Sequence, residues 1–469
     1  MRFFHPPLPA IMRTPAVPVL LACTLLATRA PAQGPLSPPP VAITHVTVVD
    51  PAGGVPLRDV TVITEGGRIR QISPAAGVEI PTGALVVNGA GRYLIAGLWD
   101  MHVHLAAAGE SVLPVLVSQG VLGVRDMGGG FEQVRAWRSR VEAGESVGPR
   151  IRTAGPIVEN AAWLARLQRI PVAAEFIASQ PRVGVSTVGE ARRAVDSLAA
   201  LGVDFVKVRN APPWAVYSAL VRHAHERGLT VVGHTPEGGI GLRGALRAGQ
   251  HTIEHIDVLA RELNPLSPAE RGQLFALMIR DHVGYTPTLV AEMTRIVRRD
   301  QVAAVVADSL GLRDPRRRRL SPELLSYWRL QQRLDAYDTQ KDWRAQIESA
   351  LGHLRAMNRA GVTMLAGTDL GARLVYPGSS LHDELALLVE HAGLSPLDAL
   401  RAATRNAAES LGLGECCGSV EVGKAADLVL LDADPLQDIR NTRRIHAVVR
   451  GGKLYSRPAL DSLTRGETR

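Results

Sequence analysis

Two histidines, His102 and His104, stand at the end of an apolar run over residues 93–99. Side chains of a β-strand alternate between its two faces, so a strand here turns both imidazoles the same way. Two imidazoles on one face can begin a metal site. Because two histidines at this spacing also arise by accident, this interpretation depends on further ligands elsewhere in the chain.

Three more metal-binding side chains follow apolar, strand-like segments. His234 and His255 each end such a segment, and Asp369 follows a third. Taken singly, each histidine could be a hydrogen-bonded structural residue, and Asp369 could cap the next helix. Their shared position at strand ends favours metal ligands. A carboxylate beside a metal pair can also act as a general base.

Lysine is rare in this chain: only four of its 53 basic residues are lysines. One of them, Lys207, lies in the apolar segment 205–208. Burial lowers the pKa of a lysine, and the neutral amine can add carbon dioxide to form a carbamate. The two carbamate oxygens could bridge two cations about 3.5–4 Å apart. The alternative is an ion pair with Asp204 or another acid.

Short apolar strands alternate with helical stretches from residue 97 onward. The predicted strands end near His102, Val124, Thr153, Val208, Val232, Ile253, Thr288 and Ala366. Eight such units predict an α/β fold of the TIM (β/α)8 barrel type over residues 97–411, with functional residues at the carboxyl ends of the strands. An Arg- and Leu-rich helical insertion at about 290–350 could shape a substrate pocket, cap the barrel or mediate homo-oligomer contacts.

Both ends of the chain are predicted to be β-structure. Residues 41–96 and 412–458 are expected to combine into one small β-sandwich, followed by a tail at 459–469. Gly66-Gly67 between two alternating stretches is typical of a hairpin. At a strand end, Arg125 is a candidate to bind a substrate carboxylate, although an internal ion pair with Asp126 or another acid is equally open.

The N-terminus carries the features of an export signal. Residues 1–32 combine basic residues, an apolar run and a small-residue cleavage site, and a Pro-rich linker at 33–40 follows. We therefore expect a periplasmic or secreted protein. The run is too short to span a membrane, and a lipid anchor at Cys23 is the alternative. The remaining cysteines, Cys416 and Cys417, are adjacent and form no disulfide framework.

Other function classes find little support in the sequence. The formal net charge is +8, but the one dense basic run, at 313–319, has little aromatic interleaving and no nucleic-acid-binding motif. Residues 239–244 match GxGxxG, yet the helical stretch that follows is too short for a dinucleotide site. We expect no nucleic-acid partner and a small-molecule substrate.

Several motifs together resemble the amidohydrolase superfamily, and within it the metal-dependent dipeptidases similar to imidazolonepropionase and prolidase. The motifs lie in family order at residues 96–104, 123–128, 202–208, 233–235, 253–255, 367–369 and 423–429. They cover nearly all of the chain beyond the export signal. The resemblance implies a hydrolase of carbon–nitrogen bonds, with dipeptides or N-acyl amino acids as the leading substrates.

The same resemblance implies a role for each candidate residue. His102, His104 and Asp369 would hold one divalent metal ion, His234 and His255 a second, and carbamylated Lys207 would bridge the two. Zinc is the expected metal, and Asp369 would be the catalytic base. Two alternatives stay open. One is a one-metal deaminase or cyclic-amide hydrolase of this superfamily, and the other is a non-catalytic barrel that binds a ligand.

Overall fold

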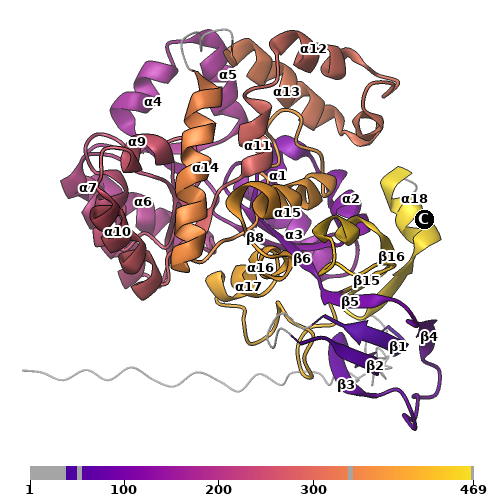
Figure 1. The fold of residues 1–469 in the computed structure, drawn as a ribbon. Coiled ribbons are helices and arrows are strands. Elements are labelled where there is room, and N and C mark those ends of the chain that lie inside the picture. Colours follow the sequence, from indigo (N-terminus) through magenta and orange to yellow (C-terminus); the bar gives the residue numbers. More distant parts are fainter. Residues whose placement is uncertain (1–37, 50–54, 336–341, 466–469) are drawn as a thin grey trace, which may run out of the picture. The chain divides into compact units, whose positions relative to one another are not determined.

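The computed structural model describes residues 38–49, 55–335 and 342–465 (Figure 1). The expected export signal at 1–32 and most of the linker at 33–40 lie outside them. Within the described part, no helix combines the length and the apolar character needed to cross a membrane.

Segments from both ends of the described chain share one eight-stranded sheet, with the order β17-β16-β15-β5-β1-β2-β3 and β4 paired to β1. Figure 1 shows the indigo strands beside the yellow ones. The termini thus meet as expected, whereas two facing sandwich layers remain a prediction. The strands are β1 (Val41–Val48), β2 (Leu57–Glu65), β3 (Arg68–Pro74), β4 (Leu85–Asn88), β5 (Tyr93–Ala96), β15 (Leu428–Leu431), β16 (Ile445–Arg450) and β17 (Lys453–Ser456).

Nine parallel strands make up the central part. Six form the sheet β10-β9-β11-β12-β13-β14, and three form β6-β7-β8. Two of them, β9 and β10, have no counterpart among the predicted strands. The strands are β6 (Leu98–Val103), β7 (Val121–Asp126), β8 (Arg150–Thr153), β9 (Ile157–Asn160), β10 (Arg182–Val185), β11 (Val206–Val208), β12 (Val231–His234), β13 (Thr252–Glu254) and β14 (Gly284–Thr286).

Backbone contacts link the two parallel sheets at both ends. On one side, the amide of Asp204 donates to the carbonyl of Thr153 at 2.9 Å, which brings the entry to β11 against β8. On the other, the predicted eighth strand is present only as isolated bridges, from Met364 to Tyr285 of β14 and from Leu370 to Val103 of β6. The strand ends that carry the candidate ligands therefore follow one another around the sheets.

Helices connect and surround these strands (Figure 1). They are α1 (Leu105–Ala108), α2 (Val112–Ser118), α3 (Phe131–Glu142), α4 (Ala161–Leu167), α5 (Pro171–Ser179), α6 (Val188–Leu201), α7 (Trp214–Glu226), α8 (Gly241–Ala248), α9 (Leu259–Leu263), α10 (Pro268–Arg280), α11 (Leu289–Thr294), α12 (Arg299–Ala307), α13 (Pro322–Asp335), α14 (Trp343–Ala360), α15 (Ser379–Ala392), α16 (Pro396–Ala402), α17 (Arg405–Ser410) and α18 (Arg457–Arg465), with 3₁₀ turns η1 (Pro315–Arg319) and η2 (Ile439–Arg443). The insertion is helical as predicted, but the expected tail begins within α18.

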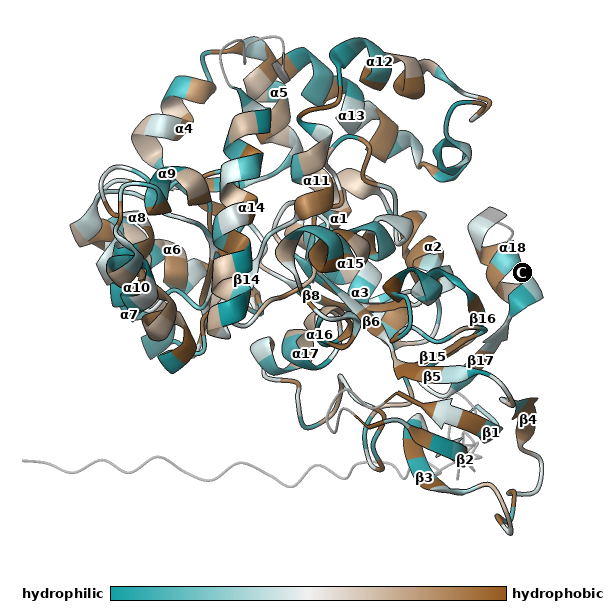
Figure 2. Cartoon of the chain, in the orientation of Figure 1, coloured by the Kyte–Doolittle hydropathy of each residue, from teal (hydrophilic) through white to brown (hydrophobic). Residues whose placement is uncertain are grey.

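The sequence of α14 illustrates why these segments are helical. Asp342 caps its first turn by accepting a hydrogen bond from the amide of Ala345, and Gly361 ends it in the left-handed conformation. Its buried side chains, among them Leu351 and Leu354, recur at helical spacing. Figure 2 shows the matching alternation of hydropathy along the helix.

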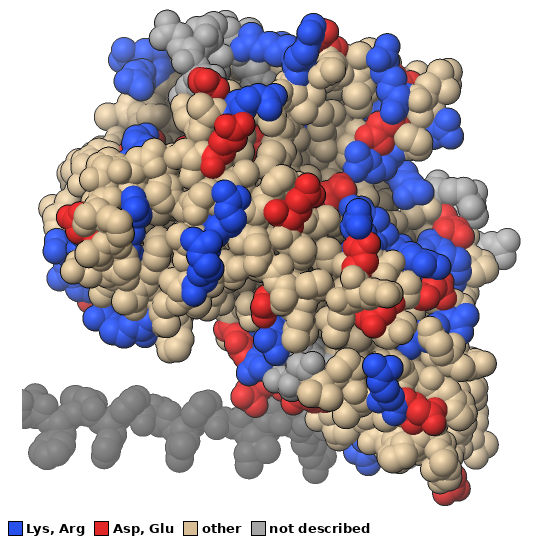
Figure 3. Space-filling model, in the orientation of Figure 1, with Lys and Arg blue, Asp and Glu red and all other residues tan. Residues whose placement is uncertain are grey.

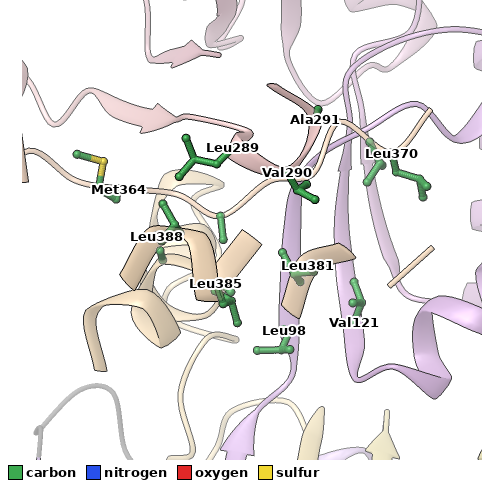
Figure 4. Packing of buried hydrophobic residues seen from close by; sticks show 14 of the residues in the cluster. Leu98, Val121, Leu289, Val290, Ala291, Met364, Leu370, Leu381, Leu385 and Leu388 are labelled. Atoms are coloured by element: carbon green, nitrogen blue, oxygen red, sulfur yellow. The ribbon is translucent and has the colours of Figure 1, made fainter. Parts of the chain in front are cut away.

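The main hydrophobic core lies between helices and the parallel strands. In Figure 4, Leu385 and Leu388 of α15 lie on the side of Leu289 and Met364, whereas Leu381 lies towards Leu98 and Val121. These positions repeat every three or four residues along α15, which turns them all to one side of the helix. Their packing fixes the segments that lead into and out of the candidate site.

The basic run at 313–319 is partly exposed and partly engaged by the protein. Arg316 pairs with Asp314 and with Asp383 of α15, and Arg317 is buried with its guanidinium against the carbonyl of Val306. The other three arginines of the run are exposed. On the face shown in Figure 3, basic and acidic residues lie interspersed.

Gly233 holds β12 close to β11. Its φ is +150°, and a Cβ atom at this position would lie 1.8 Å from the carbonyl oxygen of Val208. No side chain can occupy that space without moving a strand. Gly233 therefore sets the spacing of the two strands that carry Lys207 and His234.

We predict that Gly233→Ala lowers the free energy of unfolding by about 3 kcal/mol, because the added methyl group must push the two strands apart. Gly352→Ala in α14 is the matched control. A Cβ there meets nothing within 4 Å, so alanine should stabilise the helix by about 0.5–1 kcal/mol. Urea unfolding of both variants measures the difference, and equal stabilities would contradict the strand-spacing role.

Candidate metal centre

The predicted ligands come together at the carboxyl ends of the parallel strands. The ring centroids of His102 and His255 lie 4.6 Å apart, and those of His255 and His234 lie 4.5 Å apart. Asp369 Oδ1 is 3.5 Å from His102 Nε2 and 3.4 Å from His104 Nε2. Residues separated by more than 260 positions in the sequence thus meet at one point.

Three of the histidines use Nδ1 for a hydrogen bond to the protein. His102 Nδ1 lies 2.9 Å from Glu254 Oε2, and His104 Nδ1 lies 3.1 Å from the carbonyl oxygen of Gly128. These partners are acceptors, so in both rings Nδ1 carries the hydrogen and Nε2 keeps its lone pair. His255 Nδ1 lies 2.7 Å from the hydroxyl of Thr288. This arrangement is typical of metal-binding histidines.

The backbone turns sharply where two ligands leave their strands. Asp369 and His255 have φ values of 58° and 68°, in the left-handed region that residues other than glycine seldom adopt. Hydrogen bonds hold both turns, because the amide of Asp369 donates to the carbonyl of His102 and that of His255 to the carbonyl of Thr286. Strain of this kind persists only where the surrounding structure enforces it, and it gathers at functional sites.

Burial keeps the imidazoles neutral. It lowers the pKa of His102 to about 4, with a further contribution from the charge of Lys207. Burial and the neighbouring His102 lower the pKa of His255 to about 3, and burial places the pKa of His234 well below its ordinary value. Neutral imidazole is the form that binds metals, so these side chains are ready to coordinate at neutral pH.

Asp369 is the acidic member of the group. Burial opposes its ionisation, but the neighbouring His104 and His102 side chains hold the pKa of Asp369 well below its ordinary value. His102, His104 and Asp369 offer ligand atoms that all lie within 4.8 Å of one another. Moreover, His102 Nε2 is buried without a hydrogen-bond partner. This donor set fits a divalent cation.

Lys207 lies in the same region and is almost fully buried. Its Nζ has no hydrogen-bond partner, and burial lowers the pKa of Lys207 to about 8. The alternative partner, Asp204, is engaged elsewhere: its carboxylate accepts from Arg138 at 2.9 Å and from Arg152 at 2.6 Å. An amine buried without a partner is unusual. An ion pair between Lys207 and Asp204 does not explain its burial, because Asp204 is engaged by the two arginines.

Arg125 forms the internal ion pair that the sequence leaves open as the alternative to substrate binding. Its side chain is 1% exposed and donates to Glu254 Oε1 at 2.8 Å, to the carbonyl of Met101 and to the hydroxyl of Thr252. It does not line the cavity that contains the histidines. The proposed substrate contact is therefore corrected to an internal ion pair, with Glu254 rather than with Asp126, because buried acceptors already use its donors.

A cavity of about 220 Å³ opens beside the ligands. The insertion contributes Tyr327 and Gln331 of α13, and α5 contributes Phe176, whose ring stacks on that of Tyr327 at 5.7 Å. Arg209, next but one after Lys207, also lines the cavity. Of the roles assigned to the insertion, the shaping of a pocket is thus observed.

Sequence reasoning missed several of these residues. Glu254, Arg209 and Thr288 lie at or directly beside the predicted strand ends, so their positions offered a signal. No spacing pattern pointed to Tyr327 or Phe176, because their place in the site depends on how distant elements pack.

We predict that Arg125→Met lowers the free energy of unfolding by about 3–5 kcal/mol, because it leaves Glu254 as a buried charge without its cation. Arg261→Met is the control: Arg261 forms an exposed pair with Glu237, so the loss should stay below about 1 kcal/mol. Denaturant unfolding of the metal-free proteins compares the two. Unchanged stability combined with a raised KM would restore the substrate-binding role.

Comparisons with known proteins agree with this geometry. Residues 93–455 match the model of the amidohydrolase family. Ochratoxinase from Aspergillus niger is 25% identical over 90% of this chain and 88% of its own length. Imidazolonepropionase from Shouchella clausii is 37% identical over 107 residues, which are 21% of this chain and 23% of that protein.

A solved structure extends the likeness to the whole described fold. A putative prolidase from Bifidobacterium longum superposes with a TM-score of 0.67 at 27% identity, covering 91% of this chain and 98% of that one. The family match spans well over half of the sequence and contains every candidate ligand. The chain therefore belongs to the amidohydrolase family and is a hydrolase that acts on carbon–nitrogen bonds.

Proposed function

We propose that this protein is an exported, binuclear metal-dependent amidohydrolase that cleaves the amide bond of a dipeptide or an N-acyl amino acid. The observation that carries the proposal is the group of donors left without protein partners at one point, above all His102 Nε2 and Lys207 Nζ. The names of the similar prolidase and ochratoxinase support a small amide or peptide substrate.

In this proposal, His102, His104 and Asp369 would hold one metal ion, His234 and His255 would hold the second, and Lys207, as a carbamate, would be a ligand that the two ions share. The neutral amine adds to the carbon of carbon dioxide, forms an N–C bond and releases its proton to solvent. When bound, two divalent ions supply Lewis acidity that activates water and polarises the scissile carbonyl. Zinc suits the imidazole and carboxylate ligands.

Asp369 acts as the general base. Its low pKa keeps the carboxylate ionised, its side chain is 23% exposed, and it lines the cavity. The carboxylate takes a proton from the attacking water and returns it to the leaving nitrogen, as general acid–base catalysis requires. Glu254 and Gly128 hold the neighbouring imidazoles in the tautomer that leaves Nε2 available.

A finer description of the fold belongs to the same proposal. The hydrogen bond between Asp204 and Thr153, together with the bridges through Met364 and Leu370, supports closure of the parallel strands into an eight-stranded barrel. Similarity to a putative prolidase along most of the chain supports the same architecture. The terminal sheet would then be the small sandwich beside the barrel.

One observation favours a second candidate, a one-metal hydrolase or deaminase of the same superfamily. Among the described residues, the group whose ligand atoms lie within 4.8 Å of one another contains His102, His104 and Asp369 alone. His234 and His255 lie outside that group. The unpartnered Lys207 weighs toward two metals, because a one-metal site has no need of a bridging group.

Metal content separates the two candidates. We expect about two zinc equivalents per chain when the protein is purified with bicarbonate. Lys207→Ala should lose metal and activity because the bridge is gone, and short carboxylic acids added with fresh zinc should restore part of both. Lys453→Ala, which alters an exposed lysine, is the control and should behave as the unaltered protein does.

The outcomes of this measurement are distinct. About one equivalent in the unaltered chain, with activity on cyclic amides or amino-substituted rings, would support the one-metal candidate. No bound metal after incubation with zinc or manganese would favour the non-catalytic barrel. Full activity of Lys207→Ala would eliminate the carbamate.

Export is tested at the N-terminus. We expect a protein recovered from the periplasm or medium of a producing bacterium to begin at Gln33, since cleavage after Ala32 removes the signal. Mass spectrometry and N-terminal sequencing read this directly. A chain that begins at a lipid-modified Cys23 would support the anchor instead, and an uncleaved cytoplasmic chain would refute export.

A further inference from the structure

Arg209 directly follows β11 and lies at the wall of the cavity. Lys207, two residues earlier, lines the same cavity. The amide of Arg209 donates to the carbonyl of Val158 at 3.1 Å. The next residue, Asn210, is fixed through its amide and its side chain, which both donate to the buried Glu159 at 3.0 Å. The backbone that presents the guanidinium is thus anchored on two sides.

The side chain of Arg209 has an aromatic support but no acidic partner. Its guanidinium carbon lies 5.5 Å from the centre of the Trp163 ring, a contact that fixes the plane of the group and leaves its N–H edge open. Among the ion pairs between described residues, none includes Arg209. By contrast, Arg295 on the same cavity pairs with Glu292 at 2.7 Å, and Arg182 nearby pairs with Glu159.

A half-buried cation with open donors, facing a substrate-sized cavity, is suited to an anion. A guanidinium presents two parallel N–H groups that match the two oxygens of a carboxylate. The two acids that line the cavity are engaged by other groups: Asp369 lies against His102 and His104, and Glu292 pairs with Arg295. The charge of Arg209 is therefore left for a group that enters the cavity.

We propose that Arg209 is the specificity residue that binds the free carboxylate of the substrate, and that the substrate is an amide whose amine portion carries that carboxylate. The inference rests on the proposed function, since it concerns the same cavity. It transfers to Arg209 the role that the sequence suggested for Arg125. The stacked rings of Phe176 and Tyr327 leave an apolar wall for the remainder of the substrate.

Matched substrates test this assignment. Dipeptides and N-acetyl amino acids are compared with their C-terminal carboxamides, which differ only by the loss of charge, on the zinc-loaded protein. The unaltered protein should prefer the acid by roughly tenfold or more in kcat/KM, since a hydrogen bond to a charged group contributes this much. Arg209→Met should abolish the preference through a raised KM for the acid, and Arg209→Lys should keep part of it.

Arg166→Met, an exposed arginine on the same helix as Trp163, is the control and should keep the preference intact. An acid preference that survives in Arg209→Met would overturn the proposal. An equal loss on the acid and the carboxamide would also overturn it, because that pattern indicates a structural role.

A binding measurement separates this proposal from the proposed function. N-acetyl amino acids should raise the Tm of the unaltered protein more than their carboxamides do, and Arg209→Met should lose that difference. Carboxylate-selective stabilisation without hydrolysis of any tested amide would count against the proposed function but support Arg209. Hydrolysis without any carboxylate-selective effect would support the proposed function and overturn the role of Arg209.

Discussion

The buried ion pair of Arg125 and Glu254 is the interaction on which the site depends. A charge removed from water is tolerated only when a partner and further hydrogen bonds compensate for its lost hydration. Glu254 divides its two oxygens between Arg125 and His102 Nδ1, while Arg125 also donates to Met101 and Thr252. One pair thus connects β6, β7 and β13. The orientation of the first metal-binding imidazole is consequently coupled to the integrity of the sheet.

Burial also sets the protonation states of the side chains in the site. Removing His102, His255 and Lys207 from water lowers the pKa of each and disfavours positive charge on these three side chains. Asp369 remains ionised in the same environment. The region therefore combines neutral nitrogen donors with the carboxylate of Asp369. Such a set of side chains binds a metal cation more readily than it takes up protons at neutral pH. The left-handed backbone at Asp369 and His255 is a strained conformation, and this strain is part of the free-energy cost of assembling the site.

Strand periodicity made much of the site predictable, because His102, His104, Lys207 and His234 lie in or at the end of strands whose apolar patterns are clear. Asp369 was placed correctly beside His102 even though its segment forms only isolated bridges. Sequence patterns did not predict the features that tertiary packing determines. The direction in which Arg125 points depends on Glu254. The strands β9 and β10 have four residues each, and neither has an alternating burial pattern that would mark it as a strand.

The elements that the sequence did not reveal are also those that shape the pocket. Glu159 of β9 pairs with Arg182 of β10, the guanidinium of Arg182 lies 5.3 Å from the centre of the Phe176 ring, and Phe176 stacks on Tyr327 of the insertion. A second branch leads from Glu159 to Asn210, beside Arg209. The histidine ligands therefore follow strands that the sequence revealed, whereas the pocket wall depends on one buried acid in a strand that it did not reveal. Because Glu159 holds both Arg182 and Asn210, a change at Glu159 should alter substrate choice through both branches while leaving the ligand positions in place.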